Sequence, residues 1–368
     1  MPHAPLDLDP AVAESSSSGP IADEERYSRQ ILYPGIGAEG QRRLARAHVA
    51  IAGCGATGAA SASLLARAGV GTLMLVDRDF VEASNLQRQV LFDEADALEA
   101  LPKAEAAKRK IARFNSGITV HAQVTDLVPA NIAELFSEAD LILDATDNFE
   151  TRYLINDYAV SSGKPWIYAA AIGAYAATMN VLPKTDVEIA AAWEPTACLA
   201  CIFPKPPSGP VETCDTSGIL STAVNFAASI QVTEALKFLT GQTERMRRTM
   251  LSFDLWSSER SEISAGKPAA GCTVCGRREF THLAGEGRPH ITLCGRNSVQ
   301  IHEHHRPVDF VQMKERLTPH GDVRFNDLLL RFQRGPHTIT LFADGRAIVQ
   351  GTTDTTIARS LYARFIGS

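Results

Sequence analysis

The chain has 368 residues, of which 45% are hydrophobic and 21% are charged, so it is long enough for about two globular domains with a large core. Its net charge of −6 at pH 7 argues against a nucleic-acid or anionic-membrane surface. Polar residues interrupt the longest apolar stretch, 218–239, so the sequence predicts a buried helix there and no membrane span.

The first 22 residues are acidic and rich in serine, which predicts a disordered N-terminal tail and not a signal peptide. We expect a first domain over 23–283, a linker at 284–290 and a small α+β domain over 291–368. Four of the seven cysteines form two C-x-x-C pairs, which indicates a reducing compartment with metal or catalytic thiols. The expected location is therefore cytoplasmic.

Short apolar segments alternate with helical segments along the first half of the chain. Apolar residues without period-two alternation are typical of parallel strands that are covered on both faces. The alternation predicts a doubly wound, Rossmann-like α/β sheet. The expected strands are 48–52, 72–76, 118–122, 141–143 and 166–170, and the expected helices are 61–68, 102–114, 130–136 and 150–161.

The rest of the first domain is less regular. A strand at 174–182 precedes a segment rich in Pro, Gly and Cys at 183–217, and the buried helix and a strand at 251–255 follow. The small C-terminal domain reads as strand, helix, three strands and helix. Their expected ranges are 291–301, 310–317, 328–332, 337–342, 347–350 and 355–365.

Gly53-Cys-Gly-Ala-Thr-Gly58 lies between an expected strand and an expected helix. Glycines here let backbone N–H groups approach a phosphate at a helix N-terminus. Asp77 follows the next strand, about 20 residues after the loop, where dinucleotide-binding sheets carry a ribose-binding acid. By itself, this loop is weak evidence for ATP binding, because most chains that carry it bind NAD or FAD.

Further charged residues distinguish this chain from a dehydrogenase. Arg88 and Lys103 add two long cations, and Asp147 adds a carboxylate at the end of another strand. Because ligands bind outside the carboxyl ends of parallel strands, Asp77 and Asp147 are expected to face one crevice. Two cations and a second carboxylate later in the chain are suited to binding a triphosphate with its Mg²⁺, so the sequence indicates adenylyl chemistry.

Cys198-Leu-Ala-Cys201 and Cys272-Thr-Val-Cys275 have the spacing of two zinc knuckles, which together supply four thiolates. We expect a structural Zn²⁺ that ties the irregular segment to the end of the first domain; buried or redox-active cysteines are the alternative. Cys214 stands apart, just before the buried helix. A nucleophilic thiol and an incidental free cysteine are both open there, because Asp215 opposes a lowered thiol pKa.

Seven sequence elements together resemble the ThiF/MoeB family of ubiquitin-activating-like adenylyltransferases, which act on sulfur-carrier proteins. They occur in the family's order and span about residues 24–280. They are Tyr27-Ser-Arg-Gln30, Gly53–Gly58, Ser84-Asn-Leu-Gln-Arg-Gln89, Lys103, Ala145-Thr-Asp-Asn148, the paired C-x-x-C units and Thr213-Cys-Asp-Thr216.

The resemblance assigns expected roles to individual residues. Gly53, Gly55 and Gly58 match the nucleotide loop, and Asp77 would hold the ribose hydroxyls. Asn85, Arg88 and Lys103 would contact the phosphates, and Asp147 would bind Mg²⁺. Arg29 would reach the ATP of a neighbouring subunit, which implies a homodimer. Cys214 matches a cysteine that some members use to carry the activated carrier or its sulfur.

The resemblance implies that ATP activates the C-terminal glycine of a small ubiquitin-fold sulfur carrier as an acyl-adenylate, releasing pyrophosphate. The C-terminal tail looks like the extension of members from the thiazole branch of thiamine synthesis, so a ThiS-like carrier ending in Gly-Gly is favoured. A cysteine desulfurase or rhodanese would supply sulfur in trans. Three alternatives stay open: a MoaD-like carrier for molybdopterin or tRNA thiolation, an NAD-dependent oxidoreductase, and a nucleotide-sensing scaffold without turnover.

Overall fold

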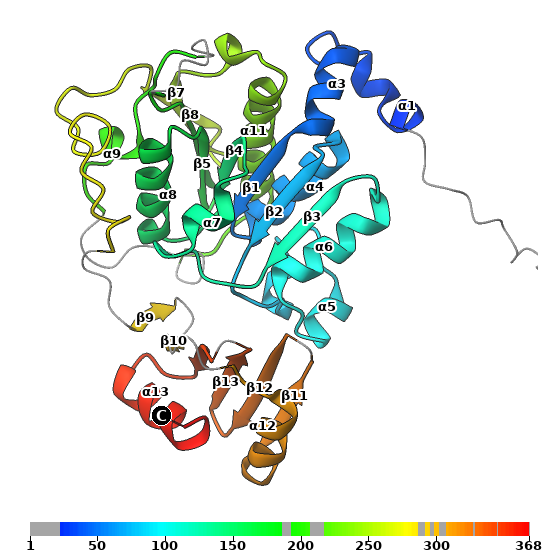
Figure 1. Cartoon of the computed structure of the whole chain (residues 1–368), viewed down its shortest axis with the longest axis vertical. Helices are drawn as coiled ribbons and strands as arrows, with labels where there is room; N and C mark the ends of the chain where they lie inside the picture. Colours follow the sequence, from blue (N-terminus) through cyan, green and yellow to red (C-terminus); the bar gives the residue numbers. More distant parts are fainter. Residues whose placement is uncertain are drawn as a thin grey trace, which may run out of the picture.

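The computed structural model describes residues 23–185, 193–206, 217–285, 291–294, 298–301, 307–326, 328–343 and 345–367. Within them the chain forms two sheets, one of eight strands and one of six. Helices lie on both faces of the larger sheet, and the smaller sheet belongs to the C-terminal part of the chain (Figure 1).

The larger sheet has the strand order β3-β2-β1-β4-β5-β6-β7-β8. Its first five strands in this order pair in parallel, as expected of a doubly wound sheet, and the remaining pairs are antiparallel. The strands are β1 (His48–Ala52), β2 (Thr72–Val76), β3 (Thr119–Gln123), β4 (Leu141–Asp144), β5 (Trp166–Ile172), β6 (Tyr175–Val181), β7 (Thr249–Asp254) and β8 (Glu259–Ser264).

The expected strands of this sheet are confirmed, with bounds that shift by at most a few residues. The exception is β8, which the sequence did not predict. All six of its residues are exposed, so it carries no apolar pattern that distinguishes a strand from a loop.

A separate apolar core lies on each face of this sheet, between the strands and the helices that cover them. Leu44, Leu65 and Val232 belong to the core on one face, and Phe136 and Ile155 belong to the other. The first face is covered by α3 (Gly37–Arg46), α4 (Ala56–Ala68), α6 (Lys103–Phe114) and α11 (Ser221–Leu239), and the second by α7 (Ile132–Phe136), α8 (Phe149–Ser162) and α9 (Leu199–Ile202). Shorter helices are α1 (Asp23–Arg26), α2 (Ser28–Ile31), α5 (Glu94–Leu98), η1 (Ala83–Asn85) and η2 (Thr243–Arg245).

Gln231 on α11 is fully buried and ties that helix to the end of β4. Its Nε2 donates to the carbonyl oxygens of Asp144 at 2.7 Å and Ile167 at 2.8 Å, and its Oε1 accepts from Ser61 on α4 at 3.0 Å. Since a buried amide is costly unless it is hydrogen-bonded, these contacts fix the two helices relative to the sheet.

The smaller sheet has the order β11-β12-β13-β14-β10-β9, and every pair in it is antiparallel. The expected single strand over 291–301 is wrong, because two paired strands occupy it. The unpredicted β11 is largely exposed and polar. The elements are β9 (Ile291–Cys294), β10 (Ser298–Ile301), α12 (Phe310–Leu317), η3 (Thr318–His320), β11 (Asp322–Phe325), β12 (Leu329–Arg334), β13 (His337–Phe342), β14 (Ala347–Gln350) and α13 (Thr355–Phe365).

The two parts share a small apolar cluster. Phe80 and Ala100 of the larger part are buried against Leu329, Phe342 and Ile348 of the smaller one. The expected linker at 284–290 stays a prediction, because 286–290 lie outside the described residues. In the described part of the chain, no helix combines the length and the hydropathy that a membrane crossing requires.

Candidate nucleotide site and cysteine cluster

The glycine loop starts where β1 ends, between β2 and β4 in the sheet. Gly53 has a φ of +92°, and a Cβ there would lie 2.8 Å from the carbonyl oxygen of Ala145. A Cβ on Gly58 would lie 1.9 Å from the carbonyl oxygen of Gly53, so only glycine fits. Gly55, the residue that precedes α4, has open space within 4 Å of its Cβ position. The loop therefore leaves the N-terminus of α4 accessible.

Asp77 lies directly against this loop. Its Oδ2 accepts a hydrogen bond from the backbone N–H of Cys54 at 2.6 Å, and its Oδ1 accepts from the N–H of Asp79 at 2.7 Å. Burial raises the pKa of Asp77, while the nearby Lys103 and the two N–H donors oppose that rise. The buried Cys54 thiol has a pKa well above its ordinary value, because it is desolvated and faces Asp77. Desolvation and Asp77 therefore disfavour the thiolate, which is the nucleophilic form of this cysteine.

Lys103 is the first residue of α6 and its side chain is almost fully buried. Its backbone N–H donates to the Asp79 carbonyl at 2.8 Å, and its Nζ lies 3.3 Å from Asp79 Oδ2. The flanking residues extend this pairing, because Val81 N–H donates to the Leu101 carbonyl at 2.8 Å. The structure thus brings Lys103 to the carboxyl end of β2 through Asp79, a residue to which the sequence analysis gave no role.

Asn85 and Arg88 are both buried at η1, the turn that follows β2. Asn85 Oδ1 accepts from the backbone N–H of Glu82 at 3.2 Å, and Glu82 in turn caps the η1 turn. Arg88 Nη1 donates to the carbonyl of Ser84 at 2.8 Å. These contacts position both side chains on the same connection that carries Asp77 and Asp79.

Asp147 is exposed, three residues after β4 ends. Arg152 on α8 supports this turn, and the sequence analysis missed it. Arg152 Nε lies 3.3 Å from Asp144 Oδ2, and Arg152 Nη2 donates to the Thr146 carbonyl at 2.6 Å. Asp144 Oδ1 also accepts from the Thr146 hydroxyl at 2.6 Å. Nothing in the sequence marks this role, because Arg152 stands among both polar and apolar residues of α8.

Asp144 and Arg152 are both buried, which fixes the Thr146 turn next to the glycine loop. Burial raises the pKa of Asp144, and the guanidinium of Arg152 opposes the rise. A desolvated ion pair of this kind is worth little as net stability, but it specifies one geometry. The turn that presents Asp147 is therefore held in place.

Arg29 lies apart from these residues, and Cys214 is not among the residues that the structure describes. Arg29 is exposed on α2, a short helix held to the C-terminal end of α4 by Gln30, whose Nε2 donates to the Ala68 carbonyl at 2.8 Å. Cys214 lies outside the described residues, so its role stays a prediction.

The four knuckle cysteines come together. The sulfurs of Cys198, Cys201, Cys272 and Cys275 all lie within 4.8 Å of one another. Three of the separations are 3.8, 3.6 and 3.3 Å. Four sulfurs at a tetrahedral zinc, each about 2.3 Å from the ion, lie about 3.8 Å apart. The donor set and its size therefore fit Zn²⁺.

Helix α8 connects the cysteine cluster to the sheet. Asn156 Oδ1 accepts from the N–H of Leu199 at 2.8 Å, and the Tyr153 hydroxyl donates to the Phe203 carbonyl at 2.6 Å. The buried Asp157 accepts from the N–H of His282 at 2.9 Å. The helix that begins beside the Asp147 turn thus also holds the segments that carry the cysteines.

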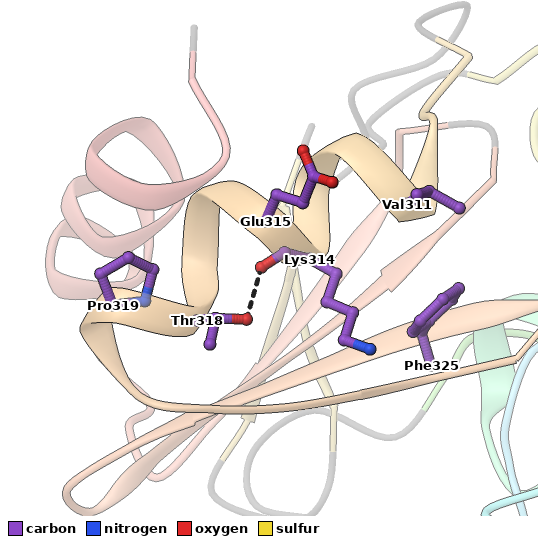
Figure 2. A pocket seen from close by; sticks show the side chains of 6 residues that line it. All are labelled: Val311, Lys314, Glu315, Thr318, Pro319 and Phe325. Carbon is purple, nitrogen blue, oxygen red and sulfur yellow. Dashed lines mark hydrogen bonds between the residues drawn. The ribbon is translucent and has the colours of Figure 1, made fainter.

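A hollow on the C-terminal part carries no comparable chemistry. Figure 2 shows Lys314 extending from α12 toward Phe325, and its Nζ lies 5.2 Å from the centre of that ring. The Thr318 hydroxyl donates to the Lys314 carbonyl at 2.7 Å. The hollow is lined by Val311, Lys314, Glu315, Thr318, Pro319 and Phe325, and we assign it no function.

Known proteins resemble the chain along most of its length. A model of the ThiF family matches residues 27–274. The chain is 43% identical over 346 residues to the sulfur carrier protein ThiS adenylyltransferase of Bacillus subtilis, covering 93% of this chain and 99% of that protein. It is 36% identical over 259 residues to the sulfur carrier protein adenylyltransferase of Thermus thermophilus, covering 68% of this chain and 90% of the other.

A solved structure shares the fold of the larger part. The E. coli MccB structure with ATP has a TM-score of 0.57 and 26% identity, covering 68% of this chain and 74% of MccB. The resemblance to the Bacillus protein, at 93% of this chain, extends into the small C-terminal part that the family model leaves unmatched.

Proposed function

The chain belongs to the ThiF family, and from this premise we propose that it adenylates the C-terminal glycine of a ThiS-like sulfur carrier, using Mg·ATP and releasing pyrophosphate. The observation that carries this proposal is that the glycine loop, Asp77 and the Asp79–Lys103 pair meet at the carboxyl ends of β1 and β2. The charged residues at this place suit a triphosphate with its Mg²⁺, whereas an NAD-dependent oxidoreductase would use the glycine loop and Asp77 but leave Arg88, Lys103 and Asp147 without a role.

The proposed reaction requires alignment and positive charge more than acid–base catalysis. A C-terminal carboxylate is already ionised at neutral pH, so it attacks the α-phosphate without a general base. The barrier comes from bringing two anions together and from the charge of the leaving pyrophosphate. Positioned cations lower both terms. The site matches this demand, since Asp79 holds Lys103 through both backbone and side chain.

We assign the nucleotide-binding roles along the crevice. Gly53, Gly55 and Gly58 would let the nucleotide approach the N-terminus of α4, and Asp77 would accept hydrogen bonds from the ribose hydroxyls. Asn85, Arg88 and Lys103 would contact the phosphates, and Asp147 would hold Mg²⁺, which neutralises their charge.

Two further roles concern assembly and metal. The exposed Arg29 would complete the site of a second subunit in a homodimer. Cys198, Cys201, Cys272 and Cys275 would bind one structural Zn²⁺, because four thiolates leave no open coordination position.

Sulfur transfer would follow adenylation. Cys214 would carry the activated carrier or its sulfur, and a separate cysteine desulfurase or rhodanese would supply the sulfur atom. Cys214→Ala should then leave adenylate formation intact and stop thiocarboxylate formation. Normal thiocarboxylate formation by this variant would assign Cys214 a structural role.

Carrier-dependent exchange of labelled pyrophosphate into ATP tests the proposed function. We expect exchange with a ThiS-like carrier ending in Gly-Gly, and a loss of about a hundredfold or more in Lys103→Ala and Asp147→Ala, since one lost transition-state contact costs about 3 kcal/mol. Arg359→Ala, on the exposed face of α13, is the control and should exchange normally. Exchange that is unaffected by Lys103→Ala, or binding of NAD in preference to ATP, would contradict the proposal.

The same assay separates the carrier alternatives. Exchange that a MoaD-like carrier supports better than a ThiS-like one would retain the chemistry and change the pathway. No exchange with either carrier, in a protein that binds Mg·ATP, would favour a nucleotide-sensing scaffold.

A further inference from the structure

Arg346 of the C-terminal part is buried against the larger part, with 1% of its surface exposed. Its Nη1 lies 3.4 Å from Asp126 Oδ2, and its Nη2 donates to the Val124 carbonyl at 3.1 Å. Asp126 and Val124 follow β3, the strand next to β2. The C-terminal part therefore inserts a cation beside the connections that form the nucleotide site.

A series of alternating positive and negative side chains leads from Arg346 to the candidate nucleotide site. Asp126 Oδ1 lies 2.8 Å from Arg78 Nη1, and Arg78 Nε lies 3.8 Å from Asp79 Oδ1. Asp79 Oδ2 then lies 3.3 Å from Lys103 Nζ. The first and last cations are nearly inaccessible to water, where charges interact more strongly than on the surface.

The surrounding contacts make this arrangement rigid. Phe80 directly follows Asp79 and Ala100 lies three positions before Lys103, and both share an apolar cluster with Leu329 and Phe342. The guanidinium of Arg331 lies 4.7 Å from the centre of the Phe80 ring. In addition, Gln350 Nε2 donates to Glu82 Oε1 at 3.2 Å, and Glu82 is the residue that forms a capping box with Asn85. The smaller sheet thus contacts residues near two of the three candidate phosphate ligands, Asn85 and Lys103. Figure 1 shows it below the larger sheet, next to α5.

We infer that Arg346 is a positioning residue for the nucleotide phosphates, acting on Lys103 through Asp126, Arg78 and Asp79; this rests on the proposed function. The cation of Arg346 attracts the carboxylate of Asp126, which in turn attracts the guanidinium of Arg78. Arg78 also attracts the carboxylate of Asp79, which weakens the interaction of Asp79 with Lys103. Without Arg346, Asp126 and Arg78 move closer together and Asp79 binds Lys103 more tightly. The phosphates must then compete with Asp79 for the lysine.

The test compares Mg·ATP with adenosine, using titration calorimetry on the full chain. Adenosine keeps the ribose that Asp77 would bind but has no phosphates. Arg346→Met should weaken Mg·ATP about fivefold and leave adenosine unchanged, as expected for a coupling across a charge network. Arg346→Lys keeps a cation and should recover most of the affinity. Arg359→Met, an exposed arginine on α13, should bind both ligands as wild type does.

Arg78→Met interrupts the same network at its partly exposed member, so it serves where Arg346→Met does not fold. It should show the same selective loss, and combining it with Arg346→Lys should weaken Mg·ATP no further. Unchanged Mg·ATP affinity in the folded variants, or equal weakening of both ligands, would overturn the inference. A wild-type protein that does not bind Mg·ATP would instead contradict the proposed function, and the inference with it.

Discussion

Lys103 and Asp79 are joined twice, through their backbones at 2.8 Å and through their side chains at 3.3 Å. The residues lie 24 positions apart, and the pairing of the segments around Phe80 and Pro102 brings them into register. The double contact places an almost fully buried ammonium group beside Asp77. Binding then needs little reorganisation of this cation, which is the condition for efficient electrostatic catalysis.

The glycine loop predicts opposite outcomes for two alanine variants. Gly58→Ala puts a methyl group 1.9 Å from the Gly53 carbonyl oxygen, and such overpacking costs about 1–3 kcal/mol of the free energy of unfolding. Gly55→Ala has open space and a φ of −72°, so its stability should be unchanged while the methyl group obstructs the nucleotide. Thermal unfolding and ATP titration separate the two effects. A Gly58→Ala protein as stable as wild type would show that the loop adapts.

The sequence allowed accurate prediction of the parallel strands and of the glycine loop between β1 and α4. Buried strands such as β2 have continuous apolar runs, and Gly53 and Gly58 occupy positions where a side chain would meet backbone atoms. Exposed strands such as β8 have no apolar pattern, and the sequence did not predict them.

Contacts between distant residues could not be predicted in the same way. Arg346 and Asp126 are 220 positions apart, and no local pattern indicates which two surfaces will meet. Arg152 was missed because a cation in a helix of mixed polar and apolar residues does not identify its own partner. The convergence of the cysteines was predictable, because a metal site requires its ligands to meet whatever the intervening chain does.

Binding of zinc should require each of the four clustered thiols. Cys272→Ser should reduce the zinc content of purified protein to well below one per chain, measured by elemental analysis, and lower the melting temperature. The control is Cys54→Ala, which removes a buried thiol outside the cluster and should retain the metal. Full zinc content in Cys272→Ser would show that these cysteines are not its ligands.

The raised pKa of the buried Asp77 leads us to expect a pH dependence of adenosine binding. Burial raises its pKa above the ordinary 3.8, so the carboxylate takes up a proton at higher pH than a solvated aspartate does. The ionised form accepts hydrogen bonds from the ribose hydroxyls more strongly than the protonated form, in which one oxygen becomes a donor. Adenosine affinity should therefore fall as the pH drops through this raised pKa. Asp77→Asn should bind more weakly and lose the pH dependence. If the adenosine affinity of both proteins falls equally at low pH, the pH dependence belongs to another group.

If Arg29 acts in the site of a neighbouring subunit, two inactive variants should complement each other. Arg29→Ala and Lys103→Ala should each lose exchange activity, and neither should cause dissociation of the dimer. A mixed dimer has one site in which both residues are present, so equal random mixing should restore about a quarter of wild-type activity. Because Arg29 is exposed, its replacement should not change the melting temperature. A mixture no more active than its components would argue against a role across subunits.

The most direct measurement of the central claim is the mass of the carrier after incubation with this protein and Mg·ATP. The account predicts that a ThiS-like carrier gains one adenylyl group at its C-terminal glycine, with one pyrophosphate released, and that Lys103→Ala abolishes the gain. An unmodified carrier after full ATP-site occupancy, or a modification that appears equally with Lys103→Ala, would contradict it.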